Sequence, residues 1–287
     1  MIKRSTIQLL RVPFSFFLMP VFWFALSFVN EINISHAILL FIIIHVLLYP
    51  SSNGYNSYMD RDTGSIGGLE KPLQPTNQLF VFTVIMDIMS ILLAFIISPL
   101  TAFLIFVYIV CSRLYSYRDI RLKQYAIPGY LIVIVNQGGL IFFTVFIAVN
   151  KDTSAAIPWL GIVCATLLIG GFYPITQIYQ HKDDAADHVR TISMMLGKKG
   201  TFIFCTVVYL LAFSLLFFYY NSVNKVLYFW IVQLFFVPVL IYFVVWFLQV
   251  NKNEENADFR HTMRMNKLAS TLTNLAFITL LILNQLD

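Results

Sequence analysis

Charged residues are scarce in this 287-residue sequence, because Asp, Glu, Lys and Arg together make up only 11% of it. A soluble globular domain carries roughly 25% charged residues, so the scarcity excludes an ordinary soluble domain. Cysteine is also rare. Cys111, Cys164 and Cys205 lie in apolar segments and lack the spacing of a zinc site. We interpret the three cysteines as small apolar residues of the interior.

Apolar side chains are abundant instead: they make up 59% of the sequence, Phe occurs 28 times, and the mean hydropathy is +0.78. Nine apolar stretches approach the ~20 residues that a helix needs to cross the hydrocarbon core of a bilayer. They are residues 12–30, 36–52, 79–97, 100–117, 127–149, 156–178, 202–220, 227–249 and 267–286. The sequence therefore predicts an all-α polytopic membrane protein with nine transmembrane helices.

The positive charges are distributed unevenly among the connecting loops. If the N-terminus lies in the cytoplasm, every Lys and Arg except Lys151 and Lys225 falls on the cytoplasmic side or close to it. This asymmetry follows the positive-inside rule and accounts for the net charge of +5 without a nucleic-acid partner. The first stretch has no small-residue cleavage site and is long enough to span, so we expect a first span and not a signal peptide.

Two polar triplets interrupt this apolar background, each at the end of a long apolar stretch. Asn53, Asn56 and Asp60 are spaced i, i+3, i+7, and Gln177, Gln180 and Asp184 repeat that spacing. Residues with this spacing stack on one face of an α-helix. Carboxylate and amide oxygens are ligands for a hard cation such as Mg²⁺. We therefore expect two helical faces that together hold a metal ion and a phosphorylated ligand, at the cytoplasmic end of the spans.

Three polar segments surround the triplets: residues 51–73, 113–130 and 173–191. The first contains a Gly-rich GSIGG sequence followed by Lys71, which would let backbone N–H groups approach an anion. The third interleaves carboxylates with Lys182 and Arg190, a mixture that suits a magnesium diphosphate. Alternatively, the three polar segments are ordinary loops exposed to water and form no binding site. The basic 113–130 loop, taken alone, is more often a determinant of topology than a site.

Isolated polar residues also occur inside the predicted spans. Asp87 and His45 lie in the third and second spans, and Asn136-Gln137 lies in the fifth. A charge in hydrocarbon is costly, so we expect Asp87 to face the interior or to be protonated. Asn136 and Gln137 would either hydrogen-bond between helices or line a pocket for an acceptor.

These motifs resemble those of the UbiA superfamily of intramembrane prenyltransferases, and the resemblance covers nearly the whole chain. The family's first motif, Asn-Asp-x-x-Asp-x-x-x-Asp with a downstream Arg-Pro-Leu-like element, is matched by residues 52–60 and by Lys71-Pro72-Leu73. Its second motif, Asp-x-x-Asp-x-x-x-Asp with a following Thr, is matched by residues 177–184 and Thr191. The family's Tyr and Lys after the fourth span match Tyr115 and Lys123, and Arg11 with Pro13 resembles its Arg-Pro pair before the first span.

Four carboxylates expected from the family are amides in this chain: Asn53, Asn56, Gln177 and Gln180. An amide oxygen can ligate Mg²⁺ but brings no negative charge. We therefore expect weaker metal binding than is usual for the family, one ion fewer, or a changed reaction.

The resemblance implies one UbiA-like domain over residues 1–287, a bundle around a central cavity, in the cell (inner) membrane with its active site facing the cytoplasm. It implies Mg²⁺-dependent transfer of an isoprenyl group from a prenyl diphosphate to an aromatic or lipid acceptor. The expected catalytic residues are Asp60, Asp184, Lys123 and Tyr115. The expected metal ligands are Asn53, Asn56, Asp60, Gln177, Gln180 and Asp184. The expected diphosphate-binding residues are Lys71, Lys182, Arg190, Arg11 and Asn136.

Two alternatives stay open at this point. A terpene cyclase of the same superfamily would ionise the same diphosphate and close the cation on its own double bonds. A non-catalytic lipid-binding or transport protein would keep the fold without the metal site.

Overall fold

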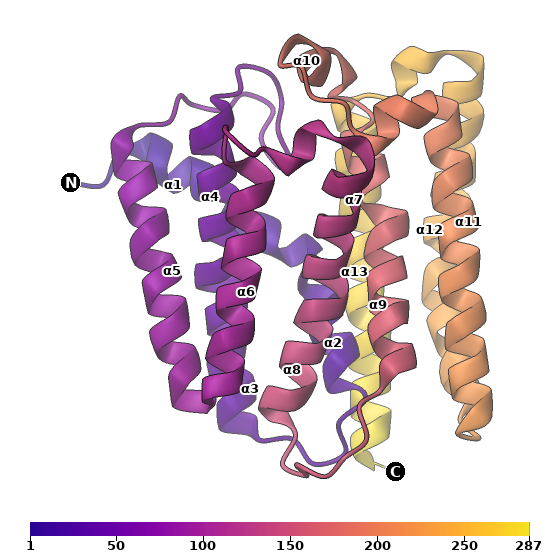
Figure 1. Cartoon of the computed structure of the whole chain (residues 1–287). Coiled ribbons are helices and arrows are strands. Elements are labelled where there is room, and N and C mark those ends of the chain that lie inside the picture. Colours follow the sequence, from indigo (N-terminus) through magenta and orange to yellow (C-terminus); the bar gives the residue numbers. More distant parts are fainter. Residues whose placement is uncertain (287) are drawn as a thin grey trace.

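The computed structural model describes residues 1–286, and their long helices stand side by side as one bundle (Figure 1). The N-terminus lies at one end of the bundle and the C-terminus at the other. Along the chain the helical elements are α1 (Arg4–Leu10), η1 (Val12–Phe17), α2 (Met19–Leu26), α3 (Ile34–Ile42), η2 (Ile43–Leu48), α4 (Tyr49–Asp60), α5 (Asn77–Ile97), α6 (Pro99–Ser116), η3 (Leu122–Gln124), α7 (Ala126–Ile134), η4 (Val135–Leu140), α8 (Ile141–Val149), α9 (Trp159–Phe172), η5 (Pro174–Gln177), α10 (His181–Ala186), α11 (Ile192–Ser222), α12 (Val226–Lys252), η6 (Glu254–Asn256) and α13 (Phe259–Leu286).

The predicted all-α membrane fold is confirmed. Among residues 1–286, eight helices are long and apolar enough to cross a membrane, and a pair bent by 41°, Arg4–Phe17 with Met19–Leu26, would make a ninth span. The eight are 34–60, 77–97, 99–116, 126–149, 159–177, 192–222, 226–252 and 259–286. The second span runs eight residues beyond the predicted end at residue 52, so the first polar triplet lies inside its last turns.

The core contains large aromatic side chains that fill the space between the helices. Phe24 of α2 stacks on Phe277 of α13 with ring centroids 4.4 Å apart, and it also contacts Phe142 of α8 edge to face at 5.3 Å. All three rings are fully buried. In lipid, helices associate through such close packing and not through hydrophobic exclusion of water, so these contacts hold the first, fifth and last spans together.

Two spans contain a π-helical turn in the middle of an otherwise α-helical segment. These are η2, between α3 and α4, and η4, between α7 and α8. A π turn adds one residue to the helix and rotates the side chains on either side of it, and it is often found at functional sites. The η4 turn contains Asn136 and Gln137.

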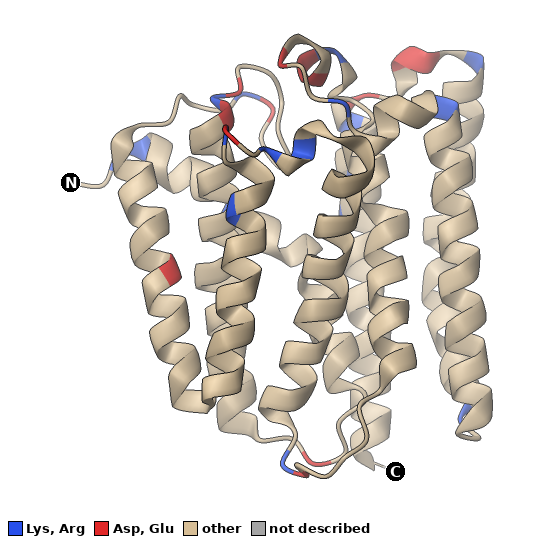
Figure 2. Cartoon of the chain, viewed as in Figure 1, with Lys and Arg blue, Asp and Glu red and all other residues tan. Residues whose placement is uncertain are grey.

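Most charged residues lie at the end of the bundle that carries α1 and α10, and only a few lie at the opposite end (Figure 2). Three segments close the charged end: residues 61–76 after α4, 117–125 after α6, and 178–191 after η5. We call these three segments the polar cap. They are tied together, because Gln180 Nε2 donates to Ser65 O at 3.2 Å and Arg190 N donates to Gln124 O at 3.2 Å.

Candidate active site

A cavity of about 150 Å³ lies beneath the polar cap. We call it the acidic cavity, because three carboxyl side chains line it: Asp60, Asp62 and Asp184. Two cationic side chains, Arg11 and Lys123, line it as well. Its remaining polar lining consists of Asn56, Tyr115, Tyr173, Thr176, Gln177, Tyr179, Gln180, Thr191 and Asn266. It therefore gathers residues from the first, second, fourth, sixth and ninth spans at one point.

The first triplet forms as the spacing predicts, because Asn53, Asn56 and Asp60 all lie on α4. The helix ends at Asp60, where Arg61 takes a left-handed conformation with φ 54°. Arg118 then occupies the exposed end of the helix, donating to Met59 O at 2.6 Å and to Asp60 O at 3.2 Å. A cation at a helix C-terminus satisfies carbonyl groups that have no partner within the helix.

The second triplet does not lie on one helical face, and that expectation is wrong. Pro174 cannot donate a backbone hydrogen bond, and α9 ends at Phe172 just before it. The chain continues as the short 3₁₀ helix η5, turns, and restarts as α10. Gln177 ends η5, Gln180 precedes α10 and Asp184 lies within it. All three nevertheless line the acidic cavity, because the turn brings them there from separate elements.

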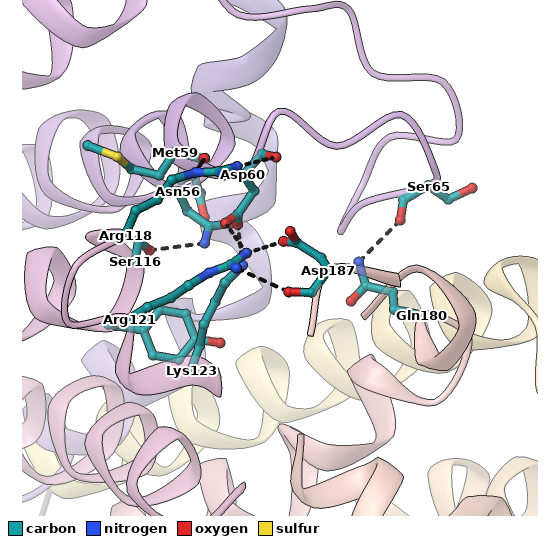
Figure 3. Close-up of polar contacts among 12 residues, drawn as sticks. Asn56, Met59, Asp60, Ser65, Ser116, Arg118, Arg121, Lys123, Gln180 and Asp187 are labelled. Atoms are coloured by element: carbon teal, nitrogen blue, oxygen red, sulfur yellow. Dashed lines mark hydrogen bonds and ion pairs between the residues drawn. The ribbon is translucent and has the colours of Figure 1, made fainter. Parts of the chain in front are cut away.

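Asp60 lies at the centre of an ion-pair network (Figure 3). Its Oδ2 is 2.5 Å from Lys123 Nζ, and its Oδ1 is 3.3 Å from Arg121 Nη2. Arg121 also pairs with Asp187 and donates from Nη1 to Asp187 O at 3.2 Å. The network joins the end of α4 to residues 117–125 and 178–191, and it holds these two segments of the polar cap in place.

The other carboxyl groups of the cavity are less well compensated. Burial raises the pKa of Asp184 to about 7, although Lys123 nearby acts in the opposite direction. Burial and the negative charge of Asp60 raise the pKa of Asp62 to about 6. Asp187 is more exposed and its pKa is lowered. Burial raises it, but the hydrogen bond from Arg121 and the positive charges of Arg121, Lys123 and Arg118 together outweigh that effect. The cavity thus holds carboxyl groups that gain stability from an added cation.

Arg11 is a buried cation with no ion pair among residues 1–286. Its guanidinium donates to Gly67 O at 3.1 Å and Asn53 O at 3.2 Å, and its Nε has no partner. Only 9% of the residue is exposed. A buried charge without a counterion is costly unless a ligand supplies the opposite charge. Arg11 and Lys123 are therefore placed to bind an anion inside the cavity.

The donor atoms present fit a hard divalent cation. Gln177 Oε1 and Asn266 Oδ1 are buried in the cavity wall and have no hydrogen-bond partner. Together with Asp60, Asp62 and Asp184 they form a set of oxygen donors, the type of ligand that Mg²⁺ takes. In the described part of the chain no three His, Cys, Asp or Glu side chains are grouped closely enough to hold a metal by themselves. A metal ion here would depend on amide oxygens and on oxygens of the ligand.

Eight of the predicted site residues line the acidic cavity: Arg11, Asn56, Asp60, Tyr115, Lys123, Gln177, Gln180 and Asp184. Two others, Asn53 and Asn136, line a neighbouring cavity instead. The three remaining cations, Lys71, Lys182 and Arg190, are exposed and are not part of the lining. Their long side chains extend from the outer surface of the polar cap.

Sequence reasoning missed several residues of the cavity. Asn266 is fully buried on α13, and neither atom of its side-chain amide has a partner. A lone Asn at the start of an apolar stretch is the signal that could have found it. Arg121 was interpreted only as a determinant of topology, and Tyr173 and Tyr179 carried no signal above the many aromatic residues of the spans.

The comparisons with known proteins agree with this geometry. The model of the UbiA prenyltransferase family matches residues 17–268. No curated protein sequence gives a significant match. Among solved structures, a UbiA homolog from Archaeoglobus fulgidus bound to DMAPP and Mg²⁺ superposes with a TM-score of 0.70 at 15% identity, covering 98% of this chain and 99% of that one.

Two further solved structures share the fold. A UbiA homolog from Aeropyrum pernix K1, in its apo form, gives a TM-score of 0.70 at 15% identity over 95% of this chain and 98% of that one. A digeranylgeranylglyceryl phosphate synthase gives 0.62 at 20% identity over 97% and 98% of the two chains. The family match covers most of the chain and the structural matches cover nearly all of it, so this integral membrane protein belongs to the UbiA prenyltransferase family.

Proposed function

We propose that this protein transfers an isoprenyl group from a prenyl diphosphate to a small acceptor, in a reaction that depends on Mg²⁺. One observation carries the proposal: the acidic cavity combines three carboxyl groups, two buried cations and unpartnered amide oxygens at the charged end of a membrane bundle. The bound DMAPP and Mg²⁺ of the Archaeoglobus fulgidus homolog support the same ligands for this chain.

The diphosphate would bind to Arg11 and Lys123. The Arg11 guanidinium has a free Nε and no acidic partner, so it gains most from an incoming anion. Lys123 is held by Asp60 and would bridge that carboxylate and a phosphate oxygen. Charge-assisted hydrogen bonds of this kind are about twice as strong as neutral ones.

Asp60, Asp62 and Asp184, with the amide oxygens of Asn56, Gln177 and Gln180, are the residues that would hold Mg²⁺. When bound, Mg²⁺ neutralises charge on the diphosphate and makes it a better leaving group. The replacement of family carboxylates by amides leaves a less negative cavity, which supports fewer or more weakly bound ions.

The first carbons of the isoprenyl chain would enter a narrow apolar cavity of about 40 Å³ that is lined in part by the same elements as the acidic cavity. Phe17, Phe24, Phe172 and Phe277 line this apolar cavity together with Ser270 and other residues of α2, α9 and α13. Ser270 follows Asn266 by one helical turn on α13, and Phe17 follows Phe14 on η1. The two cavities therefore follow one another along the same elements, the polar one for the diphosphate and the apolar one for the chain.

The protein's own residues would then promote ionisation of the donor. As the bond between C1 and the diphosphate oxygen breaks, the electron pair leaves with the diphosphate, and Arg11 and Lys123 stabilise the growing negative charge. The polar cap limits access of water, which would otherwise capture the allylic cation. The positive-inside asymmetry supports an orientation in which this end of the bundle faces the cytoplasm.

The test is product analysis with purified protein in lipid nanodiscs, supplied with geranyl or geranylgeranyl diphosphate, Mg²⁺ and candidate acceptors. We expect release of diphosphate together with a prenylated acceptor, and a large decrease of both in Asp60→Asn and Asp184→Asn protein that still folds, as shown by cooperative thermal unfolding. A cyclic hydrocarbon formed without acceptor would overturn the transferase assignment in favour of a cyclase. Unchanged diphosphate release in both variants would show that the site is wrong.

A further inference from the structure

A second polar cavity, of about 110 Å³, lies beside the acidic cavity and deeper within the spans. We call it the amide chamber, after Asn53, Asn136 and Gln137 in its wall. Hydroxyl groups of Ser52, Tyr108 and Ser112 also line it. No Asp, Glu, Lys, Arg or His side chain of residues 1–286 belongs to its lining. It is therefore polar but uncharged, in contrast to the cavity next to it.

The π turn η4 places Asn136 in this wall. Asn136 is 6% exposed; its Nδ2 donates to Tyr108 O at 3.2 Å, and its Oδ1 is buried without a partner. The turn is held against α9 at Gly138, where a Cβ atom would meet Ala165 O and Thr166 Cα at 2.7 Å. A buried amide oxygen without a donor costs free energy, so its persistence at a packed π turn indicates a ligand that donates to it.

The amide chamber and the acidic cavity share part of their walls. Asn56, Tyr115 and Tyr173 line both cavities. The hydroxyl groups of Tyr115 and Tyr173 are hydrogen-bonded at 2.6 Å, so the two tyrosines form a partition between the cavities. A ligand in the amide chamber would thus lie next to the reacting end of a prenyl diphosphate bound in the acidic cavity.

The nearest charges behind the chamber wall neutralise one another. Arg113 Nε donates to Asp87 Oδ2 at 3.0 Å, and Ser51 Oγ donates to Asp87 Oδ1 at 2.5 Å. Between this ion pair and the chamber lie Ser52 and Ser112, whose hydroxyl groups are 2.6 Å apart. Arg11 donates to the backbone oxygen of Asn53 behind another part of the wall, but its side chain lines the acidic cavity, where the diphosphate would bind it. The chamber lining therefore has no positive charge of its own with which to bind a carboxylate.

The size and lining of the chamber fit one ring with polar substituents. A cavity of about 150 Å³ in a protein core takes up benzene, and the amide chamber, at about 110 Å³, has room for no more than one small ring. The lining residues Tyr108, Tyr115 and Tyr173 can pack against an aromatic ring. Asn136 Oδ1 would accept a hydrogen bond from a hydroxyl group, and the unpartnered Asn53 Nδ2 would donate one.

We propose that the amide chamber binds the acceptor and selects a small uncharged phenol or hydroquinone. This inference rests on the proposed function. In the transfer, the bond between C1 and the diphosphate oxygen breaks, with its electron pair leaving on the diphosphate. A ring carbon beside the phenol hydroxyl forms the new C–C bond to C1, and the displaced ring proton leaves to a diphosphate oxygen. An acceptor carrying a carboxylate is disfavoured, because the chamber would bury that charge without a partner.

The test compares two acceptors of equal ring size, hydroquinone and 4-hydroxybenzoate, with geranyl diphosphate as the donor. We expect kcat/KM for hydroquinone to exceed that for 4-hydroxybenzoate at least ~10-fold, since buried groups left without partners discriminate strongly. Donor binding is measured separately, with a thiolodiphosphate analogue and no acceptor. Equal or better use of 4-hydroxybenzoate would overturn the assignment of an uncharged acceptor.

A substitution in the chamber wall tests its role directly. Asn136→Leu should raise the KM for hydroquinone at least ~10-fold and leave binding of the donor analogue unchanged. The matched control is Gln233→Leu, because Gln233 is also an amide within a span, with a buried Nε2 that lacks a partner, but it faces an apolar groove between α11 and α12. An unchanged KM for the acceptor in Asn136→Leu would overturn the inference. If the wild-type protein does not bind the donor analogue, the proposed function itself is contradicted.

Discussion

Lys123 Nζ lies 2.5 Å from Asp60 Oδ2, across the cavity wall formed by the end of α4 and the loop after α6. The pair has two consequences for the site. Without ligand, it keeps a buried carboxylate compensated, so the cavity can exist without metal. With ligand, Asp60 and Lys123 are already positioned to contact a cation and a phosphate, respectively.

Replacing Asp184 by Asn should lower the rate of diphosphate release by about 100-fold, because the cavity loses one of three carboxyl groups available to Mg²⁺. Asp152→Asn is the control, since Asp152 is exposed in the loop between α8 and α9 at the opposite end of the bundle. The measurement is a coupled diphosphate assay at saturating donor. Raising the Mg²⁺ concentration should recover part of the lost rate. A variant as active as wild type would remove Asp184 from the site.

The same substitution should stabilise the protein when metal is absent. The pKa of Asp184 is raised to about 7 in the folded protein, so the ionised form is disfavoured there relative to the unfolded chain. The resulting penalty is absent near pH 4, grows as the pH rises to 7 and stays constant above that. In EDTA at pH 8, Asp184→Asn should therefore raise the free energy of unfolding by up to about 4 kcal/mol, and the unfolding temperature by up to roughly 7 °C.

Thermal unfolding in detergent at pH 8 and at pH 5 measures this effect, and the difference between variant and wild type should shrink at the lower pH. Asp119→Asn provides the control, since Asp119 is an exposed carboxyl in the same polar cap. A stabilisation that does not change with pH would mean that ionisation of Asp184 is not its cause.

Arg11→Gln should raise the KM for prenyl diphosphate about 10-fold or more, since it removes a buried cation of the cavity wall that forms no ion pair among residues 1–286. Arg11→Lys should recover little, because a lysine cannot reproduce the two hydrogen bonds to Gly67 O and Asn53 O together with a free donor. Lys252→Gln, at the exposed end of α12, controls for a general effect of positive charge. Steady-state kinetics with varied prenyl diphosphate measure the effect. An unaltered KM for the donor in Arg11→Gln would contradict the role of Arg11 in binding the diphosphate.

The ion pair of Asp87 and Arg113 should be important for stability. Arg113→Leu leaves Asp87 without its partner inside a span, and we expect a loss of about 3–5 kcal/mol in the free energy of unfolding. The double substitution Asp87→Leu with Arg113→Leu should recover most of that loss, since no charge then remains. Unfolding temperatures of the three proteins in one detergent measure this. A double variant as unstable as the single one would argue against the ion pair as the cause.

Gly138→Ala should destabilise the protein by about 1–3 kcal/mol, because the new Cβ would lie 2.7 Å from Ala165 O and force α9 away from the π turn. Gly200→Ala is the matched control. A Cβ at Gly200 in α11 would meet only Leu196 Cβ at 3.4 Å, so the variant should gain about 0.5–1 kcal/mol from helix propensity. Equal destabilisation in both variants would contradict the close packing of η4 on α9.

Several features of the site could be predicted from residue type and spacing. Asn56 and Asp60 lie on α4 with the helical spacing that the sequence predicts, although the span extends eight residues beyond the end predicted from hydropathy. Tyr115 lies in the last turn of α6, at the end of the fourth predicted span. Gln177 and Asp184 line the same cavity, but the helix is interrupted at Pro174 and the chain turns between them. The spacing of the residues in the sequence does not predict that turn. Asn53 and Asn136 could not be assigned correctly by spacing, since which cavity a polar residue faces depends on the neighbouring helix.

Residue type and order alone account for the apolar spans, the concentration of charge at one end of the bundle and the polar residues available for a site. Each of these features can be recognised locally. A stretch of apolar residues long enough to cross the bilayer predicts a span, and each polar triplet lies within one short segment. The tertiary structure decided which residues meet. Lys123 and Arg121 reach Asp60 from more than 60 positions away along the chain, and Tyr115 pairs with Tyr173 to divide two cavities. Those contacts depend on how the helices pack against one another, and helix packing is set by many side chains together.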